Sequence, residues 1–470
     1  MSTSYKYVTQ RLGDNHYILS ARDDMKVDVH AYLSDELFAK SEDEMWNQAA
    51  NGASYEGVTG AYLMPDCHSG FGVPIGSVIV TENTLIQASV GFDISCGILH
   101  MRVTGLSASG VRGRYNRERW IHEVEKRVAL GVGSHRPELM PEFTKDKLEE
   151  ILRFGGKPIG VDPNVCERLF IPVSEDANLK RIPEAYDRAL PQLGSLGGGN
   201  HFCELQVDKD DGSVWVMIHC GSRGYGYQTA EHYFYEGANA RGIVSNRRGL
   251  SWLREDEDLG KEYWDHHNSA ANYAIANRHI IANSVREALQ EVFNADGEVY
   301  YEISHNLVQK ETLVMPDGTT KAGYVHRKGA TRAMPANHPD LVGSAWSKIG
   351  NPCLIPGSMF EGAAILMPNA GAHQTACSVN HGSGRVMARG AAKRKLEHKQ
   401  ERIDKEMHDI SRQFNGVTIE GIVTNAKHIP LDECNAVYKD LDTVVKVLQD
   451  SDIATRNRRL YPVAVIKGTD

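Results

Sequence analysis

The stretch LGGGNHFCE at residues 196–204 is the most informative part of this 470-residue sequence. It places the imidazole of His201 and the carboxylate of Glu204 directly after three glycines, which let a backbone approach a ligand closely. Four more stretches put a metal-binding or nucleophilic side chain beside glycine or a small polar residue: VGFDISCG at 90–97, IHCGSRG at 218–224, ISHN at 303–306 and NHGSGR at 380–385. This pattern is typical of a site that is assembled from several loops.

The length and composition fit a large globular protein. With 41% apolar residues the chain can bury a substantial core. If the five stretches converge on one centre, residues 60–390 must fold as a unit, and no internal repeat or obvious linker divides the chain. We therefore expect a single domain over residues 1–470. Patterns of both strands and helices occur, so the expected fold class is mixed α and β (α+β).

The local patterns predict where several elements lie. Residues 60–103 alternate short apolar runs with glycine, which predicts strands and tight loops, with Asp93 and Cys96 on a loop just past a strand. Residues 213–219 predict a buried strand that ends at His219. Helical patterns cover four ranges: 117–153, 258–293 as a pair of helices, 384–413 as one long charged helix, and 435–450. The histidines of the second range, His266, His267 and His279, are expected at the surface or in packing.

The formal net charge of −9 argues against a protein that coats nucleic acid indiscriminately. A local basic run nevertheless follows the NHGSGR stretch: Arg385, Arg389, Lys393, Arg394, Lys395, Lys399 and Arg402. This run is either a nucleic-acid groove or a solvated helix face, and the sequence leaves both open.

The sequence also bears on the compartment. Its first residues are polar and nowhere do 18 apolar residues run together, so neither a signal peptide nor a membrane span is expected. The eight scattered cysteines lack a CxxC pair and suit a reducing environment. We therefore expect a cytoplasmic protein.

Five side chains from these stretches form a candidate metal set: Asp93, Cys96, His201, His219 and His305. One carboxylate, one thiolate and three imidazoles can hold two divalent ions if the thiolate bridges them. Taken singly, each histidine is more often a core or surface residue, and a lone cysteine is more often an inert buried thiol. Soft cysteine and histidine ligands favour zinc, iron or cobalt over manganese.

His381 is the candidate nucleophile. The small residues Gly382, Ser383 and Gly384 after it leave backbone N–H groups free to line an anion, and Arg385 can pair with phosphate. An imidazole nitrogen can attack the α-phosphate of a nucleoside triphosphate and carry the nucleotide as a phosphoramidate. The alternative is a histidine that only caps the helix expected after it.

Four further stretches complete the pattern: MPDCH at 64–68, HRKGATRA at 326–333, PGSM at 356–359 and AVIKG at 464–468. Together with the five stretches above, they resemble the RtcB family of RNA-splicing ligases over residues 64–467. The resemblance implies an RtcB-like domain with a loop-built dinuclear metal centre. Asp93, Cys96 and His201 are then expected to bind one ion, and Cys96, His219 and His305 the other. It implies Mn(II) for both ions, in tension with the softness of the ligands.

The resemblance also implies a pocket for GTP. Its expected residues are Asn200, His201, Phe202, Cys203, Glu204, His305, Asn306, Pro356, Gly357, Ser358, Met359, Ala363, His381, Gly382, Ser383, Gly384 and Lys467. Glu204 suits the N1–H and amino edge of guanine, and His381 is expected to carry GMP. Asp66 and His68 match the family's DxH element and are expected to transfer protons or to orient a 5′-hydroxyl.

One segment departs from the family pattern. After Met359 the family usually has a Gly-Thr-x-Ser-like stretch, whereas this chain has FEGAA at 360–364. If the hydroxyl missing at Ala363 contacts the nucleotide, its loss weakens GTP binding by roughly 0.5–1.5 kcal/mol. The substitution Ala363→Ser is then expected to tighten GTP binding.

The function that the resemblance implies is a GTP- and Mn(II)-dependent RNA ligase. It would join an RNA 2′,3′-cyclic phosphate or 3′-phosphate end to a 5′-hydroxyl end through guanylyl-His381 and an RNA 3′-guanylyl pyrophosphate. Two alternatives stay open: a metal-dependent phosphoesterase or nuclease without a covalent nucleotide, and a non-catalytic RNA-binding paralogue. The expected partners are RNA and GTP, with no membrane. Four cations either hold RNA phosphates or tie loops together: Arg223, Arg327, Lys328 and Arg332.

Overall fold

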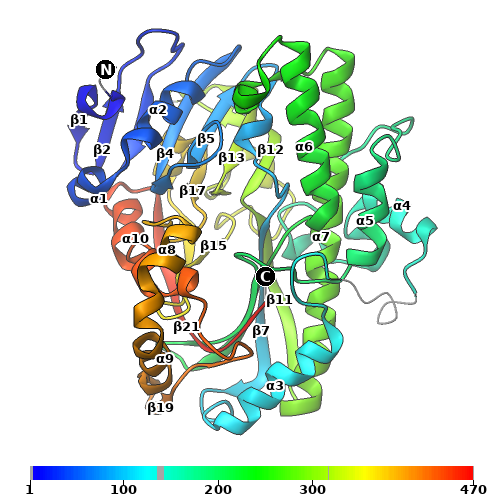
Figure 1. Cartoon of the computed structure of the whole chain (residues 1–470), viewed down its shortest axis with the longest axis vertical. Coiled ribbons are helices and arrows are strands. Elements are labelled where there is room, and N and C mark those ends of the chain that lie inside the picture. The colour runs from blue at the N-terminus through cyan, green and yellow to red at the C-terminus, as the bar shows by residue number, and fades with distance from the viewer. Residues whose placement is uncertain (1–3, 135–141, 316, 469–470) are drawn as a thin grey trace.

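Two large β-sheets form the centre of the computed structural model, which describes residues 4–134, 142–315 and 317–468 (Figure 1). The first sheet has seven strands, and all its neighbouring strands are antiparallel except β3 and β4. In spatial order these strands are β1 (Gln10–Gly13), β2 (His16–Leu19), β3 (Val29–Tyr32), β4 (Val58–His68), β5 (Ile75–Thr81), β13 (Thr320–Lys328) and β12 (Asn306–Val314).

The second sheet has eight strands and lies in the lower half of the view in Figure 1. In spatial order they are β11 (Asp296–Ser304), β7 (Gly97–Ser107), β9 (Ser213–Cys220), β8 (Phe202–Asp208), β21 (Ala454–Lys467), β16 (Ala363–Pro368) and β15 (Cys353–Pro356), with β20 (Val423–Thr424) parallel to β21. Every residue of β8 is buried. Cys203 and Leu205 on one face of β8 belong to a core that includes Trp120 and Val285, whereas Phe202 packs on the opposite side with Trp215.

Helices cover the two sheets from both sides. On the right in Figure 1 lie α3 (Arg114–Arg127), α4 (Lys145–Phe154), α5 (Pro183–Gln192), α6 (Arg223–Ala240) and α7 (Asp258–Phe293). On the left lie α1 (Asp35–Lys40), α2 (Asp43–Gly52), α8 (Arg389–Leu396), α9 (Gln400–Asp409) and α10 (Leu441–Asp450). The 36-residue helix α7 packs against β7, β9 and β11, so its buried side chains close one face of the second sheet.

Six short strands complete the structure. They are β6 (Thr84–Leu85), β10 (Leu253–Arg254), β14 (Ala330–Arg332), β17 (Ser378–Asn380), β18 (Ser411–Phe414) and β19 (Val417–Glu420). They pair as β6 with β10, β14 with β17, and β18 with β19. None of the helices in the described residues is both long and apolar enough to span a membrane.

The predicted elements are partly right. The strand predicted at 213–219 is confirmed as β9, and the mixed α and β class is confirmed. The helix pair predicted at 258–293 is one continuous helix, and His266, His267 and His279 are buried packing residues within it. Asp93 and Cys96 lie on the loop that precedes β7, rather than just past a regular strand, since the preceding element is a short 3-10 turn at Gln87–Ser89.

The predicted helix boundaries were the least accurate. The range 117–153 contains two helices, α3 and α4, and the helix predicted from 435 begins at Leu441. The helix predicted from 384 begins at Arg389 and is interrupted by a 3-10 turn at Glu397–Lys399. Gly384 has a φ of +77° and packs tightly against the Asp66 backbone, so this position cannot be helical.

Candidate active site

Strand pairing in the second sheet brings the predicted metal ligands together. In the registers of β7, β9, β8 and β11, Gly97 pairs with both Cys220 and Ser304, and His219 pairs with Phe202. The four predicted ligands Cys96, His201, His219 and His305 each lie at or next to one of these paired positions. Asp93 reaches the same place from the loop before Cys96. Segments more than 200 residues apart in the sequence thus meet where neighbouring strands of the sheet begin or end.

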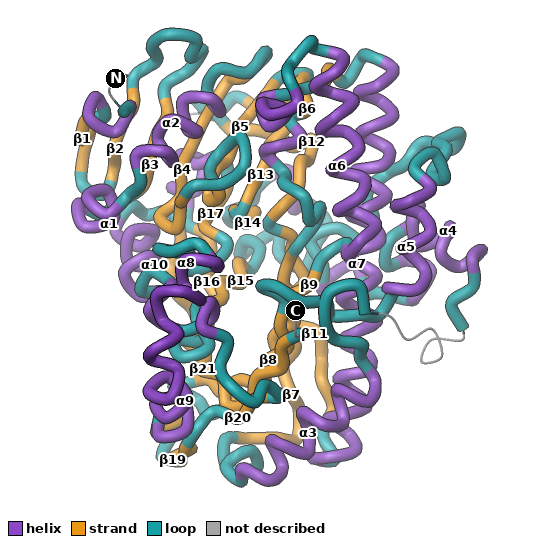
Figure 2. Tube along the Cα trace, viewed as in Figure 1, coloured by secondary structure: helices purple, strands orange, loops and turns teal. Residues whose placement is uncertain are grey.

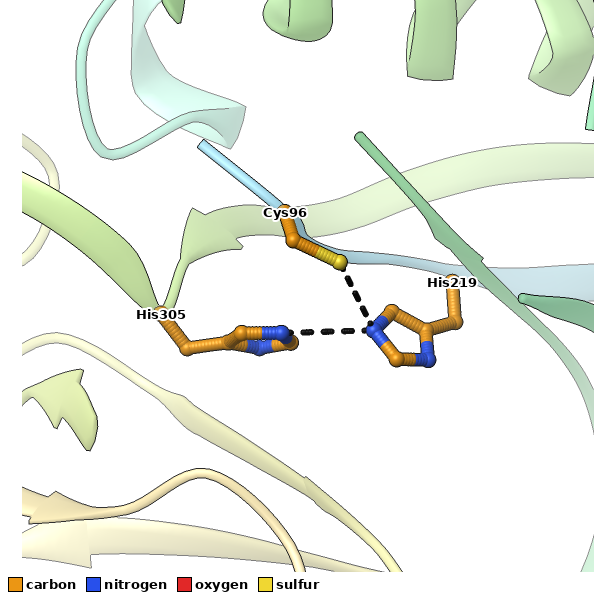
Figure 3. A group of neighbouring side chains, drawn as sticks. All are labelled: Cys96, His219 and His305. Atoms are coloured by element: carbon orange, nitrogen blue, oxygen red, sulfur yellow. Dashed lines mark hydrogen bonds between the residues drawn. The ribbon is translucent and has the colours of Figure 1, made fainter. Parts of the chain in front are cut away.

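The ligand atoms form two groups that share Cys96, and within each group they lie within 4.8 Å of one another. In the first group, His201 Nε2 lies 2.9 Å from Asp93 Oδ2 and 3.5 Å from Cys96 Sγ. In the second, His219 Nε2 lies 3.1 Å from Cys96 Sγ and 3.2 Å from His305 Nε2 (Figure 3). These are the same two groups into which the family resemblance divides the five residues.

Backbone carbonyl groups fix the orientation of two of these imidazoles. His201 Nδ1 donates to the carbonyl of Leu196 at 2.9 Å, and His219 Nδ1 donates to the carbonyl of Asn200 at 3.0 Å. Both rings therefore direct Nε2 toward Cys96. Outer partners of this kind set the tautomer of histidine ligands in metal sites.

The electrostatics of the cluster suit a divalent cation. Burial raises the pKa of the Cys96 thiol to about 12, so a thiolate forms here only with a cation beside it. Burial also lowers the pKa of His219 and His305 well below the ordinary value, which keeps them in the neutral form that binds metals. Burial opposes ionisation of Asp93, but its hydrogen bond with His201 holds the pKa at about 2. The donor set, with one carboxylate, one thiol and three imidazoles, therefore suits divalent metal ions.

The glycines before His201 have a structural role that the sequence did not reveal. Gly197 has a φ of +90°, and a Cβ at this position would overlap the guanidinium of Arg223. Arg223 in turn donates to Ser195 Oγ at 3.1 Å and to the carbonyl of Gly131 at 3.4 Å. Arg223 therefore ties the glycine-rich loop in place. The sequence left this role open beside the alternative of holding RNA phosphates.

His381 lies at the end of β17, next to the metal ligands. Its ring contacts that of His305, with 4.9 Å between centroids. His381 Nδ1 lies 2.6 Å from Oδ2 of Asp66, a fully buried carboxylate that also accepts from the His381 backbone N–H at 3.3 Å. In the neutral ring, Nδ1–H donates to Asp66 and Nε2 keeps a free lone pair. Asp66 thus holds the ring in the tautomer that a nucleophile needs.

His68 lies on the other side of Asp66. Its Nδ1 donates to the Asp66 backbone carbonyl at 3.0 Å, which again leaves Nε2 as an acceptor. Burial lowers the pKa of His68 to about 4, so the ring is neutral near pH 7. The two DxH residues therefore differ in their geometry: Asp66 orients His381, and His68 presents a free imidazole nitrogen.

A cavity of about 290 Å³ opens beside His381. Thirteen of its lining residues were predicted for the site: His68, Asn200, Phe202, Glu204, His219, Pro356, Gly357, Met359, His381, Gly382, Ser383, Gly384 and Lys467. Its walls come from both sheets and from the segment before α8. In Figure 2, β21 and its neighbour β8 lie in the lower half of the view, and Lys467 is the last residue of β21.

The remaining predicted pocket residues do not line this cavity. His201, His305 and Asn306 lie on the metal side, where Asn306 Nδ2 donates to the Asp93 carbonyl at 3.4 Å. Cys203 lies on the face of β8 opposite to Phe202 and packs in the core that includes Trp120. Ser358 is buried, and its hydroxyl donates to Asn435 Oδ1 at 2.8 Å.

Ala363, like Cys203 and Ser358, does not line the cavity. It is fully buried in β16, within a core that includes Leu354 and Leu460. Phe360 is also buried, in a separate core cluster, and Glu361 accepts from the Leu441 backbone N–H at 3.3 Å. The departure from the family pattern therefore changes packing behind the cavity, and the expected tightening of GTP binding by Ala363→Ser loses its basis.

Two polar residues that line the cavity were missed from the sequence, Glu433 and Tyr438. Glu433 lies 3.0 Å from Lys467 Nζ and accepts from the Tyr438 hydroxyl at 2.7 Å. Arg385 donates to the same hydroxyl at 3.0 Å and to the carbonyl of Asp432 at 2.7 Å. No glycine motif surrounds these residues, so only the long-range hydrogen bonds reveal their position.

The other cations divide into two sets. Arg327 is buried and forms a double ion pair with Glu311, at 2.7 and 2.8 Å, while Arg332 is buried near Glu311 and Glu167. Lys328 is buried too, and its Nζ donates to the carbonyls of residues 71 and 73. These three are structural residues. The basic run, by contrast, has exposed members on α8 and after it: Lys393, Arg394, Lys395, Lys399 and Arg402.

Comparison with known proteins agrees with this geometry. The family model described as "tRNA-splicing ligase RtcB" matches residues 48–468. The chain belongs to the RtcB family. The tRNA-splicing ligase RtcB of Thermococcus kodakarensis is 34% identical over 94% of this chain and 95% of its own length. The RNA-splicing ligase RtcB of Mycobacterium tuberculosis is 32% identical over 90% of this chain and its full length, and the RNA-splicing ligase RtcB homolog 1 of Entamoeba dispar is 31% identical over 90% of this chain. The predicted RtcB resemblance is thereby confirmed.

Proposed function

We propose that this protein is a GTP-dependent RNA ligase that joins RNA 2′,3′-cyclic phosphate or 3′-phosphate ends to 5′-hydroxyl ends. One observation carries the proposal: an imidazole with a free Nε2, fixed through Nδ1 by a buried carboxylate, faces a cavity beside two clusters of metal ligands. The names of its relatives as RNA-splicing ligases support the reaction class. Retention of labelled GMP on the denatured protein after incubation with GTP and Mn(II) tests it.

The two ligand groups would hold the metal ions, one with Asp93, Cys96 and His201 and the other with Cys96, His219 and His305. Mn(II) is proposed from the family resemblance. Bound there, two divalent ions would polarise phosphoryl oxygens and stabilise the charge that develops during transfer.

In the first step, His381 Nε2 attacks the α-phosphorus of GTP. A P–N bond forms, the bond from the α-phosphorus to the bridging oxygen breaks, and pyrophosphate leaves. Asp66 accepts from Nδ1–H throughout, so it stabilises the positive charge that the ring acquires. The product is a guanylylated His381, as expected for covalent catalysis by an imidazole.

Two further transfers complete the reaction. An oxygen of the RNA 3′-phosphate attacks the same phosphorus, the P–N bond breaks, and His381 is restored as RNA 3′-guanylyl pyrophosphate forms. A 2′,3′-cyclic end must first be opened by water to a 3′-phosphate. The 5′-hydroxyl oxygen then attacks the RNA 3′-phosphorus and GMP leaves. His68 lines the cavity with a neutral ring and a free Nε2, and we assign to it the proton of that hydroxyl.

The cavity walls suit a guanine base. Glu204 offers carboxylate oxygens to the N1–H and amino group of guanine, and Lys467 offers a donor to its carbonyl oxygen. Phe202 and Tyr438 supply aromatic surface for the purine ring. Adenine would present an acceptor and no carbonyl at the same edge, so this arrangement selects GTP over ATP.

Glu204 makes GTP binding dependent on pH. Burial raises its pKa to about 7, against the hydrogen bond from Gln206 and the charge of Lys467, while the charge of Glu433 adds to the increase. Since only the carboxylate accepts from guanine, we expect GTP affinity to rise about tenfold from pH 6 to pH 8, one unit on either side of that value. Titration calorimetry of Glu204→Gln should give weaker binding with a flat profile; the same slope in the variant would assign the titration to another group.

Removal of the Asp66 charge should impair the first step. An amide at this position can donate to His381 Nδ1, which moves the ring proton to Nε2 and blocks the nucleophile. We expect Asp66→Asn to slow guanylylation by up to about 10⁴-fold, the loss seen when a histidine is held in the wrong tautomer. Single-turnover rates with labelled GTP measure this effect. The variant Asp14→Asn, at an exposed side chain, is the control, and equal rates for Asp66→Asn and wild type would refute the role of Asp66.

The cytoplasm is the proposed location of this reaction. All eight cysteines are free, buried thiols, and the proposed chemistry needs Cys96 reduced. A reducing compartment preserves such thiols.

A further inference from the structure

A third cluster of metal-binding side chains lies away from the candidate active site. His338 precedes the 3-10 turn Pro339–Leu341, His373 lies in the 3-10 turn Ala370–Thr375, and Cys377 follows this second turn. Their ligand atoms lie within 4.8 Å of one another. Cys377 Sγ is 3.3 Å from His373 Nδ1, and the two imidazole rings stack with 5.8 Å between centroids.

The local backbone brings His373 and Cys377 together. Ala376 and Cys377 have φ values of +48° and +49°, in the left-handed region that residues with a side chain rarely adopt. This conformation turns the chain back on itself, and the Cys377 N–H donates to the carbonyl of Ala372 at 2.9 Å. As a result the thiol of Cys377 returns to the ring four residues before it.

His338 contributes a buried polar atom with no partner. Its residue is only 2% exposed, and its Nδ1 accepts from the Asp340 backbone N–H at 3.2 Å. The ring proton therefore lies on Nε2, and Nε2 is buried without a hydrogen-bond partner among the residues that the structure describes. Buried polar groups in native proteins are nearly always bonded to something, so this atom calls for a ligand.

We propose that His338, His373 and Cys377 form a third metal site that takes a single ion of the zinc class. Two imidazoles and one thiolate are a soft donor set that favours Zn(II) over Mn(II). On binding, the Cys377 S–H loses its proton to solvent and the sulfur takes the ion as a thiolate. The His338 ring proton moves from Nε2 to Nδ1, which ends the long hydrogen bond from the Asp340 N–H. One hydrogen bond is thus exchanged for a metal bond, and one proton is released.

The neighbouring carboxylates do not complete the ligand set. Glu311 is engaged by Arg327, and Asp340 accepts from the backbone N–H and the hydroxyl of Thr312 at 2.9 and 2.7 Å. His373 and Cys377 instead line a cavity of about 370 Å³. An ion held by three protein ligands would therefore keep a position open to solvent or to a small ligand from that cavity.

The site is connected to the nucleophile by one short strand. β17 begins directly after Cys377 and ends directly before His381. An ion bound at the start of β17 would fasten this strand to the turn that carries His338. The inference does not rest on the ligase reaction, because it concerns only the binding of metal.

Zinc stoichiometry tests the site. Each variant is loaded with excess Zn(II), freed of unbound metal by gel filtration and analysed by inductively coupled plasma mass spectrometry. We expect Cys377→Ser and His373→Ala each to bind one equivalent less than wild type, whatever total wild type binds. Cys434→Ser, which removes a buried thiol outside the three clusters, should match wild type. Because His373 is partly exposed, its variant keeps the test valid if Cys377→Ser fails to fold.

Cobalt spectroscopy separates this site from the dinuclear one. In Cys96→Ala loaded with Co(II), thiolate-to-cobalt absorption should persist, and it should vanish in the double variant Cys96→Ala/Cys377→Ser. Equal zinc content in wild type, Cys377→Ser and His373→Ala, or no thiolate band in Cys96→Ala, would overturn the third site. A loss of metal in Cys96→Ala alone would bear only on the dinuclear centre.

Discussion

Replacement of His381 by alanine is expected to abolish both GMP transfer to the protein and the sealing of ordinary RNA ends. Among the described residues, the substitution removes the one cavity-lining imidazole whose Nδ1 is held by the side-chain carboxylate of Asp66. It removes none of the proposed metal ligands, so the variant should bind as much metal as wild type. Guanylylation with labelled GTP and ligation of a 3′-phosphate to a 5′-hydroxyl strand measure the two losses.

A preactivated substrate distinguishes the loss of chemistry from the loss of fold. RNA that already carries a 3′-guanylyl pyrophosphate no longer needs the nucleophile, so the His381→Ala protein should seal it. His398→Ala, on the exposed surface between α8 and α9, is the matched control and should behave as wild type. A His381→Ala protein that seals ordinary ends, or one that cannot use the preactivated RNA, would contradict the assigned role.

Replacement of Cys96 by alanine should have the second large effect, because this sulfur belongs to both ligand groups. We expect bound metal to fall below one equivalent at the dinuclear centre, and guanylylation and ligation to be lost together. Since the missing ligand is the thiolate itself, raising the pH should not restore binding. Metal analysis at pH 7 and pH 9 measures this result.

A matched cysteine variant controls for packing. Cys353→Ala also removes a fully buried thiol, in β15, but outside the metal groups. It should keep its metal and its activity. Two equivalents of metal and full activity in Cys96→Ala would show that the sulfur does not bridge the ions.

The candidate metal ligands could be picked out from the sequence because each is marked by its immediate neighbours. Cys96, His201 and His305 all lie at strand ends beside glycine or small residues, and such local patterns survive in one dimension. The pairing of β7, β8, β9 and β11, which brings the ligands together, could not be derived from the pattern. The convergence was inferred from the family resemblance.

Other features depend on contacts that the sequence does not mark. Glu433 and Tyr438 reach the cavity through hydrogen bonds with Lys467 and Arg385, which come from other parts of the chain. The family motif predicted that Ala363 contacts the nucleotide. Side chains along β16 alternate between the two faces of the sheet, and Ala363 lies on a face that packs in the core. The start of α8 was predicted too early because the left-handed conformation of Gly384 results from its packing on Asp66.

Mass spectrometry of the protein treated with Mn(II) and GTP tests the central claim most directly. Proteolysis under conditions that preserve a P–N bond should yield one peptide with the added mass of GMP, and fragmentation should place that mass on His381. The same treatment with ATP should leave this peptide unmodified. An adduct on another residue, or no adduct while ligation proceeds with GTP, would contradict the proposed mechanism.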